Sequence, residues 1–376
     1  MDFDYSEEQR LLDETVRRLV KDEYEFAARK KYLAEPQGFS AAMWAKYAEL
    51  GLLGLPFAEE YGGFGGGGIE TMIVMEALGR GLALEPYLAT VVLGGGLIAL
   101  AGSDGQKSDI LPEIAAGKMM LAFAQGERHS RFDLAHVETT AKAQGAGFAL
   151  NGRKTVVLHG GAAHKFVVSA RTAGSGNDKS GITLFVVDRD AKGVTVRDYP
   201  TVDGLRAADV TLADVAVGAD AVLGPRDNAY PLIVRATDRA VAALCAEAIG
   251  IIETLNAMTL DYVKTRKQFG VAIGSFQVIQ HRLVDMLINA EQAKSMEILA
   301  AMSIDGNDQR ERERAVSAAK VQIGQSGRFV GQQAIQLHGG IGMTDEYAAG
   351  HYFKRLSSIE HTFGDTDYHL DRFPAF

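Results

Sequence analysis

Cysteine is almost absent from this sequence of 376 residues, in which Cys245 is the single example. One cysteine excludes an intramolecular disulfide and a cysteine-based zinc site. Cys245 lies inside the apolar run VAALCAEAIGII, which favours a small core residue over a reactive thiol. A chain without disulfides is typical of a reducing compartment.

The sequence also lacks a long hydrophobic run and an excess of basic residues. The longest apolar and Gly-rich stretch, residues 89–102, is shorter than the roughly 20 residues that cross a bilayer, so no membrane span is expected. A formal net charge of -9 argues against a nucleic-acid partner, because phosphate neutralisation needs a basic face. The acidic start MDFDYSEEQ is unlike a secretory signal or a transit peptide. We therefore expect a cytoplasmic protein.

The signatures of several large enzyme classes are missing as well. No GxSxG, Walker A or HExxH motif occurs, so serine hydrolases, P-loop enzymes and zincins have no sequence support. The glycines of GGFGGGG, residues 62–68, satisfy a GxGxxG spacing. A dinucleotide site needs a strand before those glycines, and the preceding LGLLGLPFAEEY does not indicate one. We interpret this match as accidental and the stretch as a loop.

Three segments of different periodicity follow one another along the chain. Residues 1–120 have helical spacing and open with Ser6 and Gln9, the pair of a capping box. Residues 121–228 contain short β-branched and aromatic runs bounded by Gly, Asn and Asp. Residues 229–376 return to long runs with a period near 3.6. The sequence predicts an α+β protein with a helical N-terminal domain, a small β sandwich or barrel, and a C-terminal four-helix bundle.

Two Gly-rich stretches lie in the C-terminal segment. RKQFGVAIGSFQ, residues 266–277, interrupts two long helices, and its Arg266 is able to pair with a phosphate in bidentate fashion. A simple turn between helices explains the same residues. QLHGGIGM, residues 336–343, ends another helix, where glycines either cap the helix or let a ligand approach the backbone closely.

A polar cluster, SSIEHTFGDTDYHL, stands near the C-terminus at residues 357–370. It contains His361, Asp365, Asp367 and His369, which are of the types that ligate metals. Clustered polar residues near a terminus are more often a solvated or capping segment, and no cysteine is present to support a zinc site. We expect no metal here.

Four stretches in this order resemble the acyl-CoA dehydrogenase family over essentially the whole chain. They are YGGFG, LNGRKTVVLHGGAAHKFVVSART, RKQFGVAIGSFQ and QLHGGIGMTDEY. The resemblance implies an FAD enzyme that oxidises an acyl-CoA thioester to the 2,3-enoyl-CoA. It also implies that Arg266 meets the FAD pyrophosphate and that Gln268 and Phe269 line the adenosine side. The residues implied to contribute across a dimer are Gln336, Gly339 and Gly340.

The sequence departs from the family pattern beside the flavin. The loop QGERHSRFD has Gly126 where the family usually carries a Thr hydroxyl. Val156 and Leu158 stand where the family commonly has a Trp and a Thr beside the flavin ring. Gly126, Val156 and Leu158 are nevertheless the positions that the resemblance assigns to the ring.

The catalytic base departs from the pattern too. Many members have a Glu immediately before a Gly near the C-terminus, where this chain has Phe363 or, shifted by one residue, Gly364. Glu247 is a candidate, because it lies in an apolar helical stretch where burial would suit a base, although an ion pair explains it equally well. Asp365 is the carboxylate nearest to the missing position and is a second candidate.

These features lead to two hypotheses. The chain is an FAD-dependent acyl-CoA dehydrogenase, or it is a half-site subunit that completes the FAD site of a partner. The losses and the ending HYFKRL…FGD..YHL resemble the small subunit of pimeloyl-CoA-type dehydrogenases. The implied partners are an acyl-CoA substrate, an unidentified electron acceptor, and either further copies of this chain or a related dehydrogenase chain in a heterotetramer.

Overall fold

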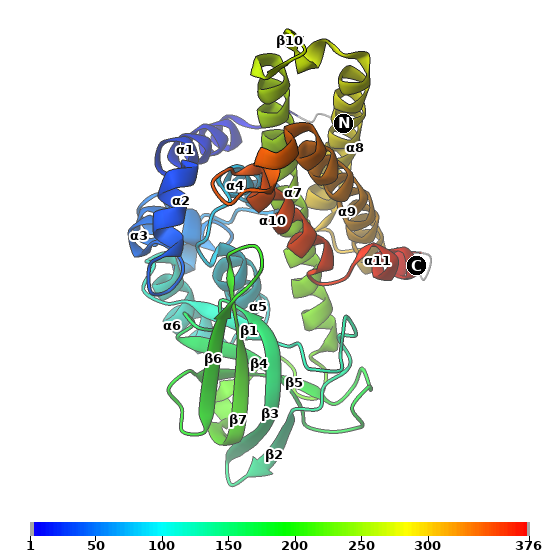
Figure 1. Ribbon diagram of the computed structural model, residues 1–376. Helices are drawn as coiled ribbons and strands as arrows, with labels where there is room; N and C mark the ends of the chain where they lie inside the picture. The colour runs from blue at the N-terminus through cyan, green and yellow to red at the C-terminus, as the bar shows by residue number, and fades with distance from the viewer. Residues whose placement is uncertain (1–3, 374–376) are drawn as a thin grey trace. The chain divides into compact units, whose positions relative to one another are not determined.

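The computed structural model describes residues 4–373, and the chain divides into two compact units (Figure 1). The bundle unit comprises the residues up to Lys31, Gly67–Ala83 and the residues from Val241 onward. The sheet unit comprises Tyr32–Gly66 and Leu84–Ala240. The predicted α+β class is confirmed, with helices in the N-terminal and C-terminal parts of the chain and a sheet between them in sequence. The three-domain boundaries at 120 and 228 remain a prediction.

Helices make up nearly all of the bundle unit. The predicted capping box opens the first of them, since Gln9 N donates to Ser6 Oγ at 3.2 Å and Ser6 N donates to Gln9 Oε1 at 3.0 Å. The helices that lie in or reach into this unit are α1 (Glu7–Glu23), α2 (Phe26–Leu33), α4 (Gly68–Gly81), α7 (Tyr230–Thr265), α8 (Gln277–Ser303), α9 (Gln309–His338), α10 (Ala349–His361) and α11 (Thr366–Arg372). α9 packs against α8, α10 and α11.

Two glycines let α4 and α7 approach closely within this unit. A Cβ placed on Gly79 would lie 2.1 Å from the carbonyl oxygen of Glu247, and one on Gly250 would lie 2.0 Å from that of Glu76. Both distances are far below van der Waals contact, so the backbones of the two helices fill the space that side chains normally occupy.

The sheet unit holds one large sheet and several short helices. The helices are α3 (Ala41–Glu49), a π-helical turn at Leu88–Gly95 that continues as α5 (Gly96–Ala101), and α6 (Asp104–Ala115). The strands are β1 (Leu121–Ala124), β2 (Thr140–Gln144), β3 (Gly147–Leu158), β4 (Lys165–Arg171), β5 (Ile182–Asp188), β6 (Val194–Pro200), β7 (Arg206–Gly218) and β8 (Val222–Leu223).

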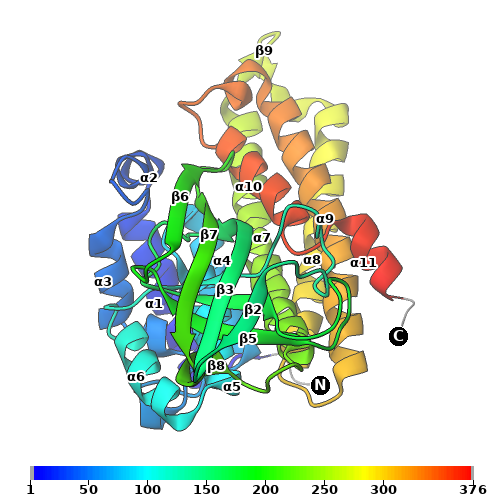
Figure 2. The ribbon, with the colours of Figure 1, turned by 90° about the horizontal axis from the view of Figure 1, so that it is seen from below.

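The eight-stranded sheet has the order β6-β7-β3-β2-β4-β5-β8, with β1 paired to β4. Figure 2 shows β6, β7, β3 and β2 side by side in this order. β3 and β7 are long antiparallel partners. Phe148, Leu150, Phe166, Phe185 and Val210 are among the buried residues that form the core of this unit. The curved, partly closed sheet is the small β domain that the short runs predicted.

One helix in residues 4–373, α7, is long and apolar enough to cross a membrane by length and composition. However, 67% of its most apolar window is buried inside the structure. Cys245, on this helix, is fully buried, and burial raises the pKa of its thiol to about 12. α7 therefore has the character of a core helix, and Cys245 that of a small core residue, as predicted.

Candidate functional site

Gly126 and Val156 lie close together in the sheet unit. Gly126 follows β1, and Thr155 N on β3 donates to the Gly126 carbonyl oxygen at 2.8 Å. A Cβ on Gly126 would lie 3.2 Å from Thr155 O, which leaves little room for a larger residue. The structure therefore brings together two of the three positions that the resemblance assigned to the flavin ring. The third, Leu158, is half-buried at the end of β3 and pairs with Ala207.

Val156 is strained as well as exposed. The β3–β7 register is interrupted between Lys154 and Val157, and Val156, in this bulge, has a φ of 53°. A β-branched residue at positive φ is a backbone outlier, and strain of this kind clusters at functional sites. The Val156 side chain is 59% exposed, so no packing explains why the chain holds it there.

Replacing Val156 by Asn is expected to raise the melting temperature, because Asn tolerates the left-handed region and little buried surface is lost. The strain relieved is on the order of 1 kcal/mol. The matched control is Val202→Asn, since Val202 is 70% exposed and is not among the described residues with positive φ. Calorimetry measures both melting temperatures. Equal shifts for the two variants would contradict the claim that the backbone at Val156 is strained.

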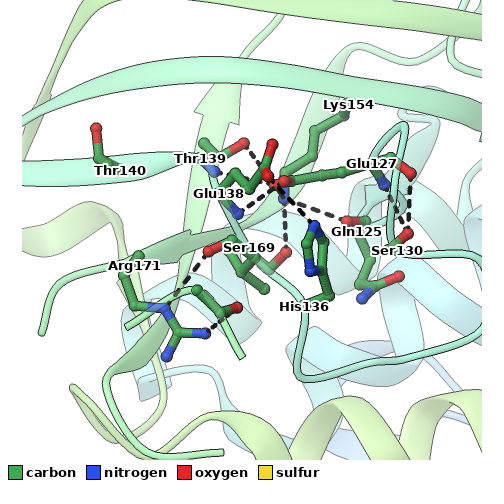
Figure 3. A network of polar contacts seen from close by, with 12 residues as sticks. Gln125, Glu127, Ser130, His136, Glu138, Thr139, Thr140, Lys154, Ser169 and Arg171 are labelled. Atoms are coloured by element: carbon green, nitrogen blue, oxygen red, sulfur yellow. Dashed lines mark hydrogen bonds and ion pairs between the residues drawn. The ribbon is translucent and has the colours of Figure 1, made fainter. Parts of the chain in front are cut away.

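A buried polar network lies beside Gly126 (Figure 3). The Glu127 carboxylate accepts hydrogen bonds from Glu138 N at 2.7 Å, Thr139 N at 3.0 Å and Thr139 Oγ1 at 2.7 Å. Among residues 4–373, the ligand atoms that converge within 4.8 Å belong to Glu127, His136 and Glu138. The Glu127 oxygens already accept these bonds, so Glu127 is part of a hydrogen-bonded network.

In the bundle unit, Arg266, Gln268 and Phe269 lie on or beside a protruding hairpin. The hairpin consists of β9 (Lys267–Gln268) and β10 (Val271–Ala272), with Phe269 and Gly270 at its turn. Phe269 has a φ of 53°, is 92% exposed, and lies edge-on to Phe276 with 6.2 Å between ring centroids. An exposed aromatic pair beside an exposed guanidinium is typical of a surface that binds a ligand or a partner.

Gln336, Gly339 and Gly340 are exposed at the end of α9 and the turn that follows. Gly339 has a φ of 65°, and no described atom lies within 4 Å of a Cβ placed on Gly339 or Gly340. Ligand atoms therefore have open access to this stretch of backbone. This geometry is compatible with both interpretations of these glycines, as a cap of α9 and as a place where a ligand approaches the backbone.

His338 joins the two Gly-rich stretches. Its ring stacks on Tyr262, four residues before Arg266, with 4.6 Å between centroids. Its Nδ1 lies 2.8 Å from the Ala334 carbonyl oxygen and its Nε2 lies 3.1 Å from the Tyr347 hydroxyl. Burial lowers the pKa of His338. The end of α7 and the end of α9 are thus packed side by side, although about seventy residues separate the two stretches.

Each candidate base has another partner in the structure. Glu247 is buried and forms a bidentate ion pair with Arg355, with Nε to Oε1 at 2.6 Å and Nη2 to Oε2 at 2.7 Å. Asp365 is the N-cap of α11 and accepts from Tyr368 N at 2.9 Å. The ion-pair alternative for Glu247 is therefore the arrangement observed, while a catalytic role for either carboxylate remains a prediction.

The turn that replaces the usual C-terminal Glu is held by buried cationic and polar groups. Phe363 has a φ of 58° and Gly364 one of 115°. Lys320 Nζ donates to the carbonyl oxygens of Ile359 at 2.8 Å, Thr362 at 2.7 Å and Gly364 at 2.9 Å. Burial lowers the pKa of Lys320 to about 8. His369, on α11, is fully buried, and Asp365 caps that helix, so the polar cluster at 357–370 spans the end of α10, the turn and most of α11.

Comparison with known proteins decides the family. Models of the N-terminal, middle and C-terminal domains of acyl-CoA dehydrogenases match residues 6–118, 122–215 and 231–373. Probable acyl-CoA dehydrogenase YngJ of Bacillus subtilis is 32% identical over 365 residues, which cover 96% of this chain and 95% of that protein. The chain belongs to the acyl-CoA dehydrogenase family.

Solved structures of acyl-CoA dehydrogenases superpose on nearly the whole chain. A variant of the Tcur3481-Tcur3483 steroid ACAD is 30% identical, with a TM-score of 0.88 and coverage of 98% of this chain and 97% of that one. The ChsE4-ChsE5 complex from Mycobacterium tuberculosis is 27% identical, with a TM-score of 0.90 and coverage of 100% and 98%. The predicted fold is that of the acyl-CoA dehydrogenase family.

FAD is the cofactor of this family, as the resemblance implied, and the described residues fit it. The exposed Arg266 guanidinium presents a planar donor fork that matches a phosphate. The open backbone at Gly339 and Gly340 allows a bulky ligand to approach, and the exposed Val156 offers apolar surface to a flat ring. Each unit taken by itself, Arg266 and the open backbone suit the phosphate part of such a cofactor, and Val156 suits its flat ring.

Sequence reasoning missed three buried charges: Lys154, Lys320 and Arg355. A signal existed for Lys154, because Phe148 and Leu150 are buried on alternate positions of β3 and continuing that alternation reaches Lys154. No comparable signal exists for Arg355, whose partner Glu247 lies 108 positions earlier.

Proposed function

We propose that this acyl-CoA dehydrogenase chain oxidises an acyl-CoA thioester to the 2,3-enoyl-CoA. A carboxylate removes the α proton, and donors on the thioester carbonyl stabilise the developing enolate. FAD supplies the redox step by accepting the β hydrogen as hydride at N5. The observation that carries the proposal is the packing of the ends of α7 and α9 through Tyr262 and His338, which gathers two of the family's four stretches at one end of the bundle unit.

In this proposal the chain binds FAD through two groups of residues. Arg266 pairs with the pyrophosphate in bidentate fashion, and Gln268 and Phe269 line the adenosine. Gly126, Val156 and Leu158 face the isoalloxazine. The residues that contribute across a dimer are Gln336, Gly339 and Gly340. The exposed ring pair of Phe269 and Phe276 supports this, because exposed apolar side chains that lie together are typical of a binding surface.

A half-site subunit is the second candidate, and a specific observation favours it. Both oxygens of Glu247 accept from Arg355, so the structure shows this carboxylate in an ion pair. Asp365 caps α11. The Tcur3481-Tcur3483 and ChsE4-ChsE5 structures each name two chains, which supports a heteromer in which this chain supplies part of a partner's site.

One experiment separates the two candidates. The chain is purified alone and again with a candidate partner chain of the same family from the same organism, and absorbance between roughly 350 and 500 nm reports bound flavin. Flavin and turnover in the chain alone support the complete dehydrogenase. Flavin or turnover only in the mixture supports the half-site subunit. If neither preparation contains flavin or oxidises an acyl-CoA, both candidate functions are wrong.

Oligomer formation is proposed to use one face of α8. Exposed apolar residues lie on that face in two groups, with the exposed Glu291 and Ser295 between them; the groups are Val284, Leu287 and Ile288, and Leu299 and Met302. We call the two groups the apolar stripe of α8, and exposed apolar groups on one helix face are typical of a surface that a second chain covers.

Leu287→Glu is therefore expected to yield a smaller species in light scattering after size exclusion, because a buried charge opposes association. Leu11→Glu is the matched control, since Leu11 is 66% exposed on α1, away from this stripe. If both variants and the unmodified protein have equal masses, α8 is not part of the interface.

The remaining partners follow from the chemistry. An FAD dehydrogenase would need an electron acceptor, whose identity the proposal leaves open, and we propose that the chain acts in the cytoplasm.

A further inference from the structure

Lys154 is a fully buried lysine in the middle of β3. Its side chain is 0% exposed, and its Nζ donates to Gln125 O at 3.2 Å, Glu127 Oε1 at 2.6 Å and Ser169 Oγ at 2.9 Å (Figure 3). An ammonium group has three N–H donors, so all of them are used. Two of the three acceptors belong to the residues on either side of Gly126.

Glu127 extends this contact to the far end of the same loop. Its carboxylate accepts from Lys154 and from three donors of Glu138 and Thr139, directly before β2 begins. One ion pair therefore fastens both the start and the end of residues 125–139 to β3. Burial opposes the charge of Glu127, but Lys154 and the hydrogen-bond donors outweigh it and hold the pKa of Glu127 below its ordinary value.

A buried ion pair is a costly way to stabilise a sheet. Desolvation of the two charges offsets much of their attraction, and apolar residues of similar size often stabilise a core equally well. Burial lowers the pKa of Lys154 to about 8, with Glu127 opposing the shift, which reflects this desolvation. What an ion pair provides better than apolar packing is a fixed geometry between the parts that it joins.

The geometry that this pair fixes is that of Gly126 against the bulge of β3. Lys154 binds both neighbours of Gly126, and the next residue, Thr155, donates its N–H to Gly126 O at 2.8 Å. Val156 follows with its positive φ. A strained residue persists only where its surroundings hold it, and the ion pair lies directly beside this one.

We infer that Lys154 and Glu127 are a positioning pair, which holds Gly126 and Val156 in the arrangement that receives the isoalloxazine ring. This inference rests on the proposed assignment of those two residues to the flavin. Neither charged group contacts the ring in this scheme. Both act through the backbone of residues 125–127 and 154–156.

The test compares three variants with the unmodified protein, each freed of flavin and titrated with FAD. Lys154→Met leaves the Glu127 charge buried without its cation, so it is expected to lower both the melting temperature and FAD affinity. The double variant Lys154→Met/Glu127→Gln removes both charges, and its amide oxygen still accepts from Thr139 or Glu138. It is expected to melt within about 4 °C of the unmodified protein.

The double variant decides between positioning and simple stabilisation. If the pair positions the loop, the double variant regains stability, but its dissociation constant for FAD stays raised roughly 10- to 100-fold. Losses of this size are found when a residue that orients metal ligands is replaced. If the pair only stabilises the sheet, FAD affinity returns together with stability, and the inference is overturned. The flavin absorption spectrum provides a second readout, since a displaced ring changes its surroundings.

Two further variants keep the inference testable. Ser169→Ala provides a test if the double variant does not fold. It removes one acceptor from Lys154 without changing a buried charge, and it is expected to weaken FAD binding about 3-fold or more. Phe148→Leu, in the core of the sheet unit, is a control that lowers stability without touching the loop, so its FAD affinity should be unchanged. Unaltered FAD affinity in Ser169→Ala and the double variant would overturn the positioning role alone. An unmodified protein that binds no FAD, alone or with its partner chain, would overturn the proposed function as well.

Discussion

Arg355→Met is expected to lower the free energy of unfolding by about 3–5 kcal/mol, the range found when one member of a buried ion pair is removed. Arg355 donates to both oxygens of Glu247, at 2.6 and 2.7 Å, and both side chains are at least nine-tenths buried. Without Arg355 the carboxylate stays in a site closed to water, with its strongest donors gone. Urea unfolding at neutral pH measures the loss.

The control removes the charge as well as its partner. In the double variant Glu247→Met/Arg355→Met, two apolar side chains of similar length replace the pair, and stability is expected to recover most of the loss. If Arg355→Met is as stable as the unmodified protein, water reaches Glu247 and the ion pair is not shielded from solvent.

The same pair bears on the question of the base. Glu247→Gln keeps an oxygen that accepts from Arg355 but removes the ability to take a proton. If Glu247 is the base, turnover falls by roughly 100-fold or more, as is usual for a lost general base. Turnover that persists in this variant would assign Glu247 to the ion pair alone.

The sequence predicted those features that arise from patterns within one short segment of the chain. The capping box at Ser6 and Gln9, the period of the bundle helices and the short strands are local patterns, and each appears in the structure. The contact between Glu247 and Arg355 depends on how α10 packs against α7 in the bundle unit, which no spacing in the sequence reveals. The sequence therefore left two readings of Glu247 open, and only the packing shows the ion pair.

The flavin positions illustrate a second limit. The sequence shows that Val156 and Leu158 differ from the family pattern, but substitution patterns contain no dihedral angles. The positive φ of Val156 arises because β3 carries an extra residue against β7 between Lys154 and Val157. A strand bulge of this kind follows from pairing between strands about fifty residues apart, so the strain at Val156 is visible only in the structure.

Acidification is expected to destabilise the protein through His369. This side chain is fully buried, and its Nε2 lies 3.1 Å from the Phe363 carbonyl oxygen, which only accepts, so Nε2 carries the proton. Nδ1 faces the Ser317 hydroxyl at 3.3 Å. Burial, and then the charges of Lys320 and Arg372, lower the pKa of His369 to about 3.

The sign of the effect follows from the two states. An unfolded histidine has a pKa of about 6.5, so between about pH 6.5 and pH 3 the unfolded chain binds one more proton than the folded chain. Stability from this group is complete above that window and falls by up to about 1.4 kcal/mol for each pH unit on descending through it. Urea unfolding at pH 7, 6 and 5 measures the slope.

His369→Gln separates this contribution from those of the carboxylates. The Gln amide is able to donate to the Phe363 carbonyl but has no proton to gain, so the variant is expected to be less stable at pH 7 and to approach the unmodified protein as the pH falls. His361→Gln is the matched control, because His361 is exposed at the end of α10. Parallel curves for His369→Gln and the unmodified protein would mean that His369 already takes up its proton in the folded state. The Phe363–Gly364 turn would then be open to water.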